Sequence, residues 1–420
     1  MKRDMLRGRD IVLISSIEWD FNWQGHQELA TRLARDGNCV LYVENMGVRS
    51  PGLRDARRVA QRLSHWAGSL LDGGVRQVSP NLYVCSPLIL PPFGSDVRRH
   101  LNRRLLLPLI RRAVRGLGLE PDVVWTFLPT DTAASLVRMF SGPRGVVVYY
   151  CIADFAELTP HSQDILNSER SIIDMSDVIF AQGSRLAERC SRVGKKVEVC
   201  PFGVNFDLFM RRADERGAPS ANDSGGTIRR SAAAELMSGL PRPIIGYVGG
   251  IHDVFDAQMM ASMARAKRDW SWVLVGPQQT PTPEMRRMPN VYLTGPKPHE
   301  ELPDYISRFD VGIVPYIMNG YTETVIPTKI NEYLAMGKPV VSTNLPEVAS
   351  FNSRHGVLIT CPNRPKEFIA SIERALHSTG EGADETRRRT VAAANDWGER
   401  FERMSKLVDL ELRKKERRLK

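Results

Sequence analysis

Two kinds of segment alternate along the chain: short apolar runs, and longer stretches with apolar residues at helical spacing. The apolar runs of the first half are residues 11–17, 39–43, 82–85, 122–127, 145–150, 177–181 and 197–200. Those of the second half are residues 243–248, 271–275, 290–293, 310–314, 339–342 and 356–359. Many of these runs are apolar almost throughout, which is typical of parallel strands that are covered on both faces.

Helices are predicted between these strands. They span residues 24–35, 96–117, 131–139, 163–175 and 184–193 in the first half, and 255–267, 300–307, 365–377 and 384–414 in the second, with a short helix after Pro327. Pro108 interrupts the helix over 96–117, where we expect a kink. Strands that alternate with helices at this spacing predict an α/β fold with parallel, doubly wound sheets and right-handed crossovers.

Residues 211–239 break the alternation. They contain almost no large apolar side chains and are rich in Gly, Ser, Ala and charge, so they predict an exposed linker. A chain of 420 residues is also too long for one ordinary core. The predicted organisation is an N-terminal Rossmann-like domain over 1–205, a linker over 206–240, a C-terminal Rossmann-like domain over 241–395, and a basic helix over 396–420 that could pack back on the first domain.

The composition, 42% hydrophobic and 25% charged, is that of a folded globular protein. No apolar run approaches the roughly 18–20 residues that a membrane-spanning helix needs. The apolar stretch near the N-terminus is short and leads into Glu18, Trp19 and Asp20, which favours a first strand over a secretion signal. The six cysteines lie singly, without histidines at zinc spacing, so we expect reduced thiols in a cytoplasmic protein and no metal site.

The net charge of +10 comes mainly from clustered arginines. Between residues 98 and 115, seven arginines interleave with leucines, and Arg54, Arg57, Arg58 and Arg62 form an earlier cluster near Leu63 and Trp66. Such a basic amphipathic segment is typical of contact with an anionic membrane surface or with a lipid-linked substrate. The alternative is a helix packed on a sheet, with its arginines in solvent. Nucleic acid is disfavoured because no nucleic-acid-binding module accompanies the charge.

The most informative motif is PTKINEYLAMGKPVV, residues 327–341. It predicts a short helix that opens at Thr328, just after a proline, and ends at a glycine before a buried strand. Lys329 and Glu332 lie three residues apart, on one face of the first turn. A lysine and free N–H groups at the positive end of a helix suit a phosphate, and the carboxylate can accept hydrogen bonds from vicinal hydroxyls. The pattern suits a diphosphate joined to a ribose, although ordinary surface helices also begin this way.

Two further segments could contribute to the same site, because ligands of open α/β sheets bind at the carboxyl ends of the strands. Gly249-Gly250 follows the strand over 243–248, and the absence of a Cβ lets the backbone approach a phosphate. Lys297 follows the strand over 290–293 and could add charge, or could be an ordinary loop lysine. The glycines do not form a full G-x-G-x-x-G motif, which disfavours a dehydrogenase.

In the first half, residues 19–26 combine aromatic rings with amides and carboxylates, a mixture that suits a sugar ring. His26 ends this segment, and Asp154 follows the strand over 145–150, so both are candidates for a site between the two halves. Each could equally be an ordinary residue of a helix start or a loop. The absence of a Ser-His-Asp set, a metal cluster and a P-loop argues against a hydrolase or a kinase.

Taken together, four segments resemble nucleotide-sugar glycosyltransferases of GT-B architecture, close to the retaining family 4 (glycosyltransferase group 1). They are SDVIFAQGSRLAERCSRVGKKVEVCPFGVNFDLF, IIGYVGGIHDVFD, NVYLTGPKPHEELPDYISRFDVGIVPY and PTKINEYLAMGKPVVST. The resemblance implies two Rossmann-like domains that face each other across a cleft. It also implies a nucleotide-sugar donor, a carbohydrate or lipid-linked acceptor, a role in polysaccharide or glycolipid synthesis, and no cofactor.

The resemblance also implies roles for the candidate residues. Glu332 would hold the donor ribose, Lys329 and Lys297 would neutralise the diphosphate, and Gly249-Gly250 would contact phosphate or acceptor. The family's glutamate that contacts the transferred sugar is replaced by Thr324, with Glu323 adjacent, and His252 and Asp253 stand where the family usually has arginine. These departures leave open a non-catalytic donor-binding protein. A nucleotide-sugar epimerase of similar fold is the other alternative, although it would need more acid and base groups at the cleft than the sequence offers.

Overall fold

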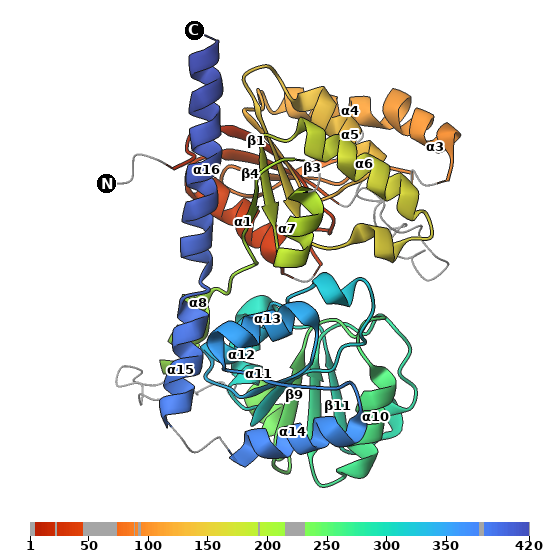
Figure 1. Cartoon of the computed structure of the whole chain (residues 1–420), viewed down its shortest axis with the longest axis vertical. Coiled ribbons are helices and arrows are strands. Elements are labelled where there is room, and N and C mark those ends of the chain that lie inside the picture. The colour runs from red at the N-terminus through yellow and green to blue at the C-terminus, as the bar shows by residue number, and fades with distance from the viewer. Residues whose placement is uncertain are drawn as a thin grey trace, which may run out of the picture. The chain divides into compact units, whose positions relative to one another are not determined.

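The computed structural model describes residues 5–21, 23–44, 74–87, 89–90, 94–191, 194–214, 232–377 and 382–419. The chain divides into two compact units. Unit 1 comprises Met1–Pro201 together with Phe401–Lys420, and unit 2 comprises Phe202–Arg400. Each unit is built on its own sheet (Figure 1). The predicted α/β fold with two doubly wound parallel sheets is confirmed.

The sheet of unit 1 has eight strands in the order β3-β4-β2-β1-β5-β6-β7-β8. The strands are β1 (Asp10–Ile14), β2 (Cys39–Val43), β3 (Val75–Ser79), β4 (Leu82–Cys85), β5 (Val123–Thr126), β6 (Val146–Cys151), β7 (Val178–Ala181) and β8 (Val197–Val199). All neighbours are parallel except β3 and β4, which are antiparallel. The edge strand β3 was not predicted, because its sequence VRQVS is partly polar and lies half in solvent.

The helices of unit 1 are α1 (Gly25–Arg35), α3 (Asp96–Leu101), α4 (Leu107–Gly116), α5 (Asp131–Phe140), α6 (Ser162–Met175), α7 (Ser184–Ser191) and most of α16 (Trp397–Arg418). Helix α1 packs against β2 and β4, α5 against β5, and α6 against α5 and β6. Large side chains fill the interior between helices and sheet, with Trp125 and Tyr149 fully buried.

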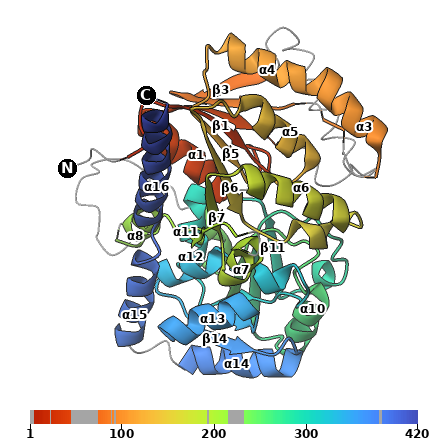
Figure 2. The same ribbon diagram turned by 45° about the horizontal axis from the view of Figure 1, so that its top comes forward.

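The predicted helix over 96–117 is formed, but it contains a π-helical segment, Asn102–Leu106, between α3 and α4. Pro108 explains this widened turn, because it has no N–H to donate and its ring would collide with the preceding turn of a regular α-helix. Leu107, Ile110, Ala113 and Val114 face the interior. Figure 2 shows this helix in orange along the edge of unit 1.

Helix α16 supplies the last element of unit 1. Its buried residues Met404, Val408 and Leu412 recur every four positions and form an apolar stripe. The N–H of Leu6 donates to Ser405 Oγ at 2.8 Å, and Lys415 Nζ lies 2.7 Å from Asp177. The single helix predicted over 384–414 is instead two helices, α15 (Gly382–Ala393) and α16. They are separated where Asp396 accepts a hydrogen bond from the N–H of Gly398, as a capping residue does.

The sheet of unit 2 has six parallel strands in the order β11-β10-β9-β12-β13-β14. They are β9 (Ile244–Val248), β10 (Ser271–Val275), β11 (Val291–Gly295), β12 (Val311–Val314), β13 (Val340–Thr343) and β14 (Ile359–Cys361). The helices are α10 (Ala257–Ala266), α11 (Leu302–Ile306), α12 (Lys329–Ala335), α13 (Pro346–His355), α14 (Pro365–His377) and α15. The direction of winding reverses between β9 and β12, and ligands of open α/β sheets bind at such a point.

The predicted linker over 206–240 is partly wrong. Within it, α8 (Phe206–Asp214) and α9 (Ala232–Met237) are helices of unit 2. Phe209 and Met237 are buried in the core of that unit. The low apolar content of residues 211–230 led to the prediction of a linker, although apolar residues at either end of the segment belong to helices. Residues 215–231 lie outside the described residues.

Among the residues that the structure describes, no helix combines the length and the apolar character needed to cross a membrane.

Candidate functional site

The best-supported site lies in unit 2, around the side chain of Lys329 at the start of α12. Lys329 is 8% exposed. Its Nζ lies 2.5 Å from the hydroxyl of Tyr316 and 3.4 Å from that of Tyr247. It also lies 4.6 Å from the ring centroid of Tyr247 and 4.8 Å from that of Tyr316. Two buried tyrosines therefore enclose the ammonium group.

This ammonium group has no carboxylate counterion in the described part of unit 2. Burying a charge without an opposite charge costs several kcal/mol by general estimates, so such a group is retained where a ligand supplies the missing charge. Phenol hydroxyls can also donate hydrogen bonds to an anion. The arrangement around Lys329 therefore suits an anionic ligand.

Glycines bring two loops against this lysine. Gly249, which follows β9, has φ +130°, and a Cβ there would lie 2.9 Å from Lys329 Nζ. Gly276, which follows β10, packs against the backbone of Gly249. A Cβ at Gly276 would lie only 2.1 Å from the carbonyl oxygen of Gly249. The carbonyl of Gly250 accepts a hydrogen bond from Tyr247 at 2.8 Å. The structure thus brings Gly249, Gly250 and Lys329 together.

Glu332 lies one turn after Lys329 on α12 and is half-buried. Burial raises the pKa of its carboxyl group, while the nearby His299 and Lys329 act in the opposite direction. Among the described residues, none makes a hydrogen bond or ion pair with this carboxylate, so its oxygens are available to hydroxyl donors. Thr328, just before the helix, is half-buried, and its side chain does not cap the helix.

The other candidates of unit 2 have local partners. The ammonium of Lys297 lies over the ring of Tyr305, 5.7 Å from its centroid. Glu323 and Thr324 belong to a 3-10 turn, Thr322–Thr324, before α12, and both are half-buried. The hydroxyl of Thr324 donates to the carbonyl of Tyr321 at 2.9 Å. Lys297 and Thr324 therefore have partners other than Lys329.

In unit 1, His26 lies inside α1 and is 1% exposed. Its Nε2 lies 3.0 Å from Ser16 Oγ, and its ring centroid lies 4.2 Å from that of Phe127. Burial lowers the pKa of His26 to about 3, so the ring is neutral near pH 7 and does not supply a positive charge. The aromatic residues before it pack together, with Trp19 and Trp23 5.9 Å apart, while Asn22 lies outside the described residues.

Asp154 is engaged within unit 1. Its carboxylate accepts a hydrogen bond from the N–H of Ala156 at 3.1 Å and forms an ion pair with Arg189. Arg189 also contacts both carboxylate oxygens of Glu169, at 2.7 and 2.8 Å, and Tyr149 donates to Glu169 at 2.5 Å. This network fixes the loop after β6, which gives Asp154 a structural role.

A cluster with metal-ligating atoms adjoins this network. The ligand atoms of Cys151, Glu169 and Cys190 all lie within 4.8 Å of one another, and the three residues are buried. Glu169 is already paired with Arg189, however, and a metal would compete with that ion pair. Hydrogen bonding to Cys190 and burial raise the pKa of the Cys151 thiol, which disfavours the thiolate that a metal needs. We assign the cluster a structural role.

Tyr247, Tyr316 and Gly276 are site residues that the sequence analysis missed. Tyr247 is a hydroxyl-bearing residue in the buried strand IIGYV, and Tyr316 follows the strand VGIV and Pro315. A polar side chain in a fully buried strand needs a partner, and that was the available signal. The identity of the partner depends on the fold.

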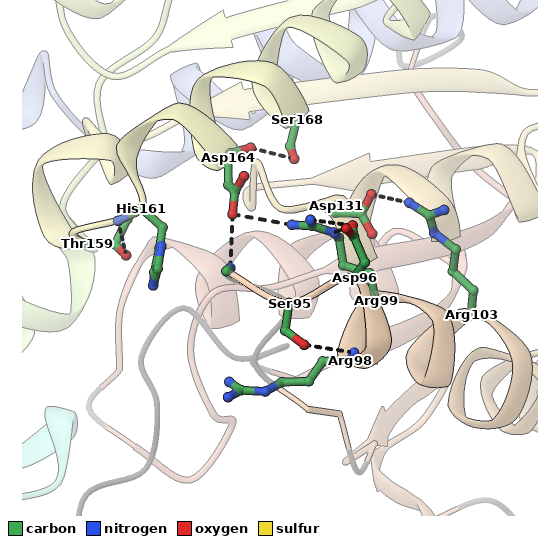
Figure 3. Close-up of polar contacts among 11 residues, drawn as sticks. Ser95, Asp96, Arg98, Arg99, Arg103, Asp131, Thr159, His161, Asp164 and Ser168 are labelled. Carbon is green, nitrogen blue, oxygen red and sulfur yellow. Dashed lines mark hydrogen bonds and ion pairs between the residues drawn. The ribbon is translucent and has the colours of Figure 1, made fainter.

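The basic segment 98–115 contains two kinds of arginine (Figure 3). Arg99 bridges Asp96 and Asp164, at 2.6 and 3.3 Å, and Arg103 pairs with Asp131, so these two anchor the helix. The others are exposed and make no ion pair in the described ranges: Arg98, Arg104, Arg111, Arg112 and Arg115. Val97 and Leu105 beside them are 69% and 59% exposed. The earlier cluster at Arg54, Arg57, Arg58 and Arg62 lies outside the described residues.

Comparison with known proteins adds two findings from sequence. Residues 242–378 match the family model described as "Glycosyl transferases group 1". The Bacillus subtilis (strain 168) protein named "Putative teichuronic acid biosynthesis glycosyltransferase TuaH" is 31% identical over 255 residues. That match covers 59% of this chain and 60% of the relative, so the chain spans about 60% of the length of the curated protein it matches.

Solved structures resemble nearly the whole chain. Anabaena Alr3699/HepE in complex with UDP has a TM-score of 0.62 at 15% identity, covering 95% of this chain and 99% of that one. The trehalose 6-phosphate synthase of Burkholderia multivorans has a TM-score of 0.64 at 13% identity, covering 99% and 100%. The sucrose-phosphate synthase of Thermosynechococcus elongatus has a TM-score of 0.60 at 16% identity, covering 98% and 99%. At these identities the likeness concerns the fold.

Proposed function

We propose that the protein is a GT-B glycosyltransferase that transfers a sugar from a nucleoside diphosphate to a hydroxyl acceptor. The match of residues 242–378 to the glycosyl transferases group 1 model and the likeness of the fold to solved glycosyltransferase structures support this proposal. The observation that carries the proposal is the buried ammonium of Lys329, which has no carboxylate partner among the described residues, with Glu332 one turn away. The first supplies charge for a diphosphate, and the second supplies acceptor oxygens for ribose hydroxyls.

The proposed reaction proceeds with retention and without a protein nucleophile. The bond between the sugar and the diphosphate breaks, the acceptor oxygen bonds to the anomeric carbon on the same face, and the acceptor proton passes to a leaving diphosphate oxygen. Negative charge grows on that diphosphate, and a positioned cation stabilises it. Lys329 fills this role, with the hydroxyls of Tyr247 and Tyr316 beside it. Because a protein cation does this work, no metal is assigned to the step.

The remaining candidates keep supporting roles. Glu323 and Thr324 occupy the turn that precedes α12 and are assigned to the transferred sugar. Lys297 is assigned to the diphosphate, and His26 and Asp154 to the shape of the acceptor side rather than to proton transfer. The donor is proposed as a uridine diphosphate sugar, because HepE is described in complex with UDP and with UDP-glucose. The named relative belongs to teichuronic acid biosynthesis, which supports a polysaccharide as the product.

One observation favours a second candidate, a donor-binding protein without transferase activity. The hydroxyl of Thr324, at the position where the family places a sugar-contacting glutamate, is engaged by the carbonyl of Tyr321. An epimerase is the third candidate. The three predict different products from the same nucleotide sugar, so one assay separates them.

We expect release of uridine diphosphate from a uridine diphosphate sugar only when an acceptor extract is present. Glu332→Ala is expected to weaken uridine diphosphate binding about tenfold and to reduce this release, because the ribose hydroxyls lose a charged acceptor. Calorimetric titration and chromatography of the nucleotides measure the two effects. A changed sugar without acceptor would indicate an epimerase, and binding without release would indicate a binding protein. Unchanged affinity of Glu332→Ala would contradict the assignment of this residue.

The exposed arginines of the basic segment support a second part of the proposal, attachment to an anionic membrane surface. Arg104, Arg111 and Arg112 are exposed and form no ion pair with any residue that the structure describes, and Leu105 lies among them with 59% of its surface exposed. Positive charge attracts anionic lipid headgroups, and exposed apolar side chains can enter the interface. We therefore propose a peripheral position at the membrane surface, where a lipid-linked acceptor would lie.

The triple variant Arg104→Gln, Arg111→Gln and Arg112→Gln is expected to bind vesicles of anionic phospholipid about 100-fold more weakly, since each arginine near such a surface contributes about 1 kcal/mol. Vesicle cosedimentation at several salt concentrations measures the change. Arg103 is left in place because it pairs with Asp131.

The control removes the same charge elsewhere, at Arg268, Arg287 and Arg354, which are exposed residues of unit 2. Equal weakening by this control variant would show that net charge alone drives binding. Unchanged binding by the first variant would reject the surface on α3 and α4.

A further inference from the structure

A pocket of unit 2 lies away from the strand ends that carry Lys329. It has a volume of about 490 Å³ and is formed where β12 and β13 begin and α12 ends. In a parallel sheet the strand starts and the strand ends lie at opposite edges, so this pocket is separate from the proposed donor site. The function proposed above does not use it.

The pocket carries an excess of positive charge. Its cationic residues are Arg242, Arg308, Lys338, Arg388 and Arg389, and its carboxylates are Asp310 and Glu385. Five positive and two negative groups leave an excess of three positive charges. Both carboxylates are already used, because Asp310 pairs with Arg242 and Glu385 pairs with Arg389 at 2.7 Å.

Three cations of the pocket remain outside these two pairs, namely Arg308, Lys338 and Arg388, and the last two carry the proposal. The described residues of unit 2 offer neither of them an oxygen of Asp or Glu within ion-pair distance. Lys338 Nζ donates to the carbonyl of Ser307 at 2.7 Å, and Arg388 Nε donates to the carbonyl of Gly337 at 2.8 Å. An ammonium has three donors and a guanidinium has five, so each keeps donors for a ligand.

Burial makes this charge costly in the absence of a ligand. Arg388 is 6% exposed, and Lys338 is half-buried. Burial lowers the pKa of both groups, although Asp310 and Glu385 act in the opposite direction on Lys338, and Asp384 and Glu385 on Arg388. A bound anion would offset this cost, because it supplies the opposite charge and accepts the remaining hydrogen bonds.

We propose that this pocket binds a small phosphate ester. Guanidinium and ammonium groups match the charge and geometry of phosphate oxygens. The volume exceeds the needs of a phosphate group and falls in the range of small-molecule sites, which leaves space for a carbon body. Phe309, Met336 and Pro339 also line the pocket and provide apolar contacts for that body.

The position of the pocket links it to α12. Lys329 and Glu332 lie near the beginning of this helix, and Gly337 and Lys338 follow its end. Arg388 donates to the carbonyl of Gly337 and so holds this end in place. A ligand bound to Lys338 and Arg388 therefore contacts the residues that anchor the helix of the proposed donor site.

The test uses the full-length protein and two probes, glycerol 3-phosphate and inorganic phosphate, titrated calorimetrically. We expect saturable binding of glycerol 3-phosphate, with inorganic phosphate several-fold weaker because it makes no apolar contacts. Lys338→Gln and Arg388→Gln should each weaken glycerol 3-phosphate about tenfold, the usual effect of losing one charge-assisted hydrogen bond. Thermal unfolding of each variant without probe confirms that it is folded, and two variants are used because Arg388 also supports Gly337.

Matched variants separate this site from the donor site. Arg268→Gln removes an exposed charge of unit 2 that does not line the pocket and should leave the affinity unchanged. Lys329→Met should also leave it unchanged, while Arg388→Gln should still bind uridine diphosphate. Absence of saturable binding, or equal affinities for the wild type and for both pocket variants, would overturn the proposal. Loss of binding in Lys329→Met alone would assign the probe to the donor site, and equal affinity for the two probes would overturn the assignment to an ester.

Discussion

Replacing Lys329 by methionine is expected to weaken uridine diphosphate binding about 100-fold, or about 2.7 kcal/mol, while the unliganded protein keeps or gains thermal stability. The ammonium is buried between Tyr247 and Tyr316, and no carboxylate in the described part of the chain pairs with it, so its charge destabilises the protein until a ligand binds. Methionine has a similar volume and no charge. Removing the charge therefore removes the desolvation cost that the unliganded protein bears, and it also removes the main cation that would bind the diphosphate.

Calorimetric titration and thermal unfolding measure these two effects on the same preparations. Lys366→Met is the control, since Lys366 is exposed on α14. The opposite signs are the informative part of the result, because a merely misfolded variant would lose stability and affinity together. An unchanged affinity would remove Lys329 from the site, and a marked fall in the unfolding temperature would show that its charge is already compensated.

Gly276→Ala is expected to lower the free energy of unfolding by about 3 kcal/mol and to impair nucleotide binding. The added Cβ would lie 2.1 Å from the carbonyl oxygen of Gly249, which belongs to the backbone and cannot rotate away. Gly276 also has φ +150°, a conformation that alanine rarely adopts. The loop after β9 would have to move, and it is the loop that lies against Lys329.

The control is Gly295→Ala, at the last residue of β11. Gly295 has φ +74°, but a Cβ there would meet no atom within 4 Å. Only the backbone conformation is then strained, and we expect a loss of about 1 kcal/mol without an effect on nucleotide binding. Chemical denaturation of both variants gives the comparison. Equal losses would mean that the contact between the loops is not tight in solution.

The strands could be predicted because a parallel strand that is buried on both faces appears in the sequence as a continuous apolar run. IIGYV and VGIV each lie at a strand whose burial is complete, so the sequence pattern and the structure agree. The edge strand β3 has no such apolar run, because part of it is exposed to water. The helices α8 and α9 were missed because the charged residues between them dominated the composition.

The same distinction applies to the site. Lys329, Glu332 and Gly249 were predicted because helix geometry and strand order place them from local sequence alone. The enclosure of Lys329 by Tyr247 and Tyr316 could not be predicted, because it joins residues 82 and 13 positions apart. The pairing of Arg99 and Arg103 with acidic residues of α5 and α6 likewise depends on tertiary contacts, which decide which arginines are left for a partner.

The contribution of α16 to unit 1 has a consequence for the order of synthesis. Ribosomes make residues 401–420 after every residue of unit 2, yet Met404, Val408 and Leu412 of this segment are buried in unit 1, most of which is made before unit 2. Every residue of unit 2 is therefore synthesised before the core of unit 1 can be completed. A premature stop codon just before Phe401 would leave unit 2 with its complete sequence, but it would remove the apolar stripe of α16. Unit 1 would then expose the residues that this stripe covers, a surface that chaperones and proteases recognise.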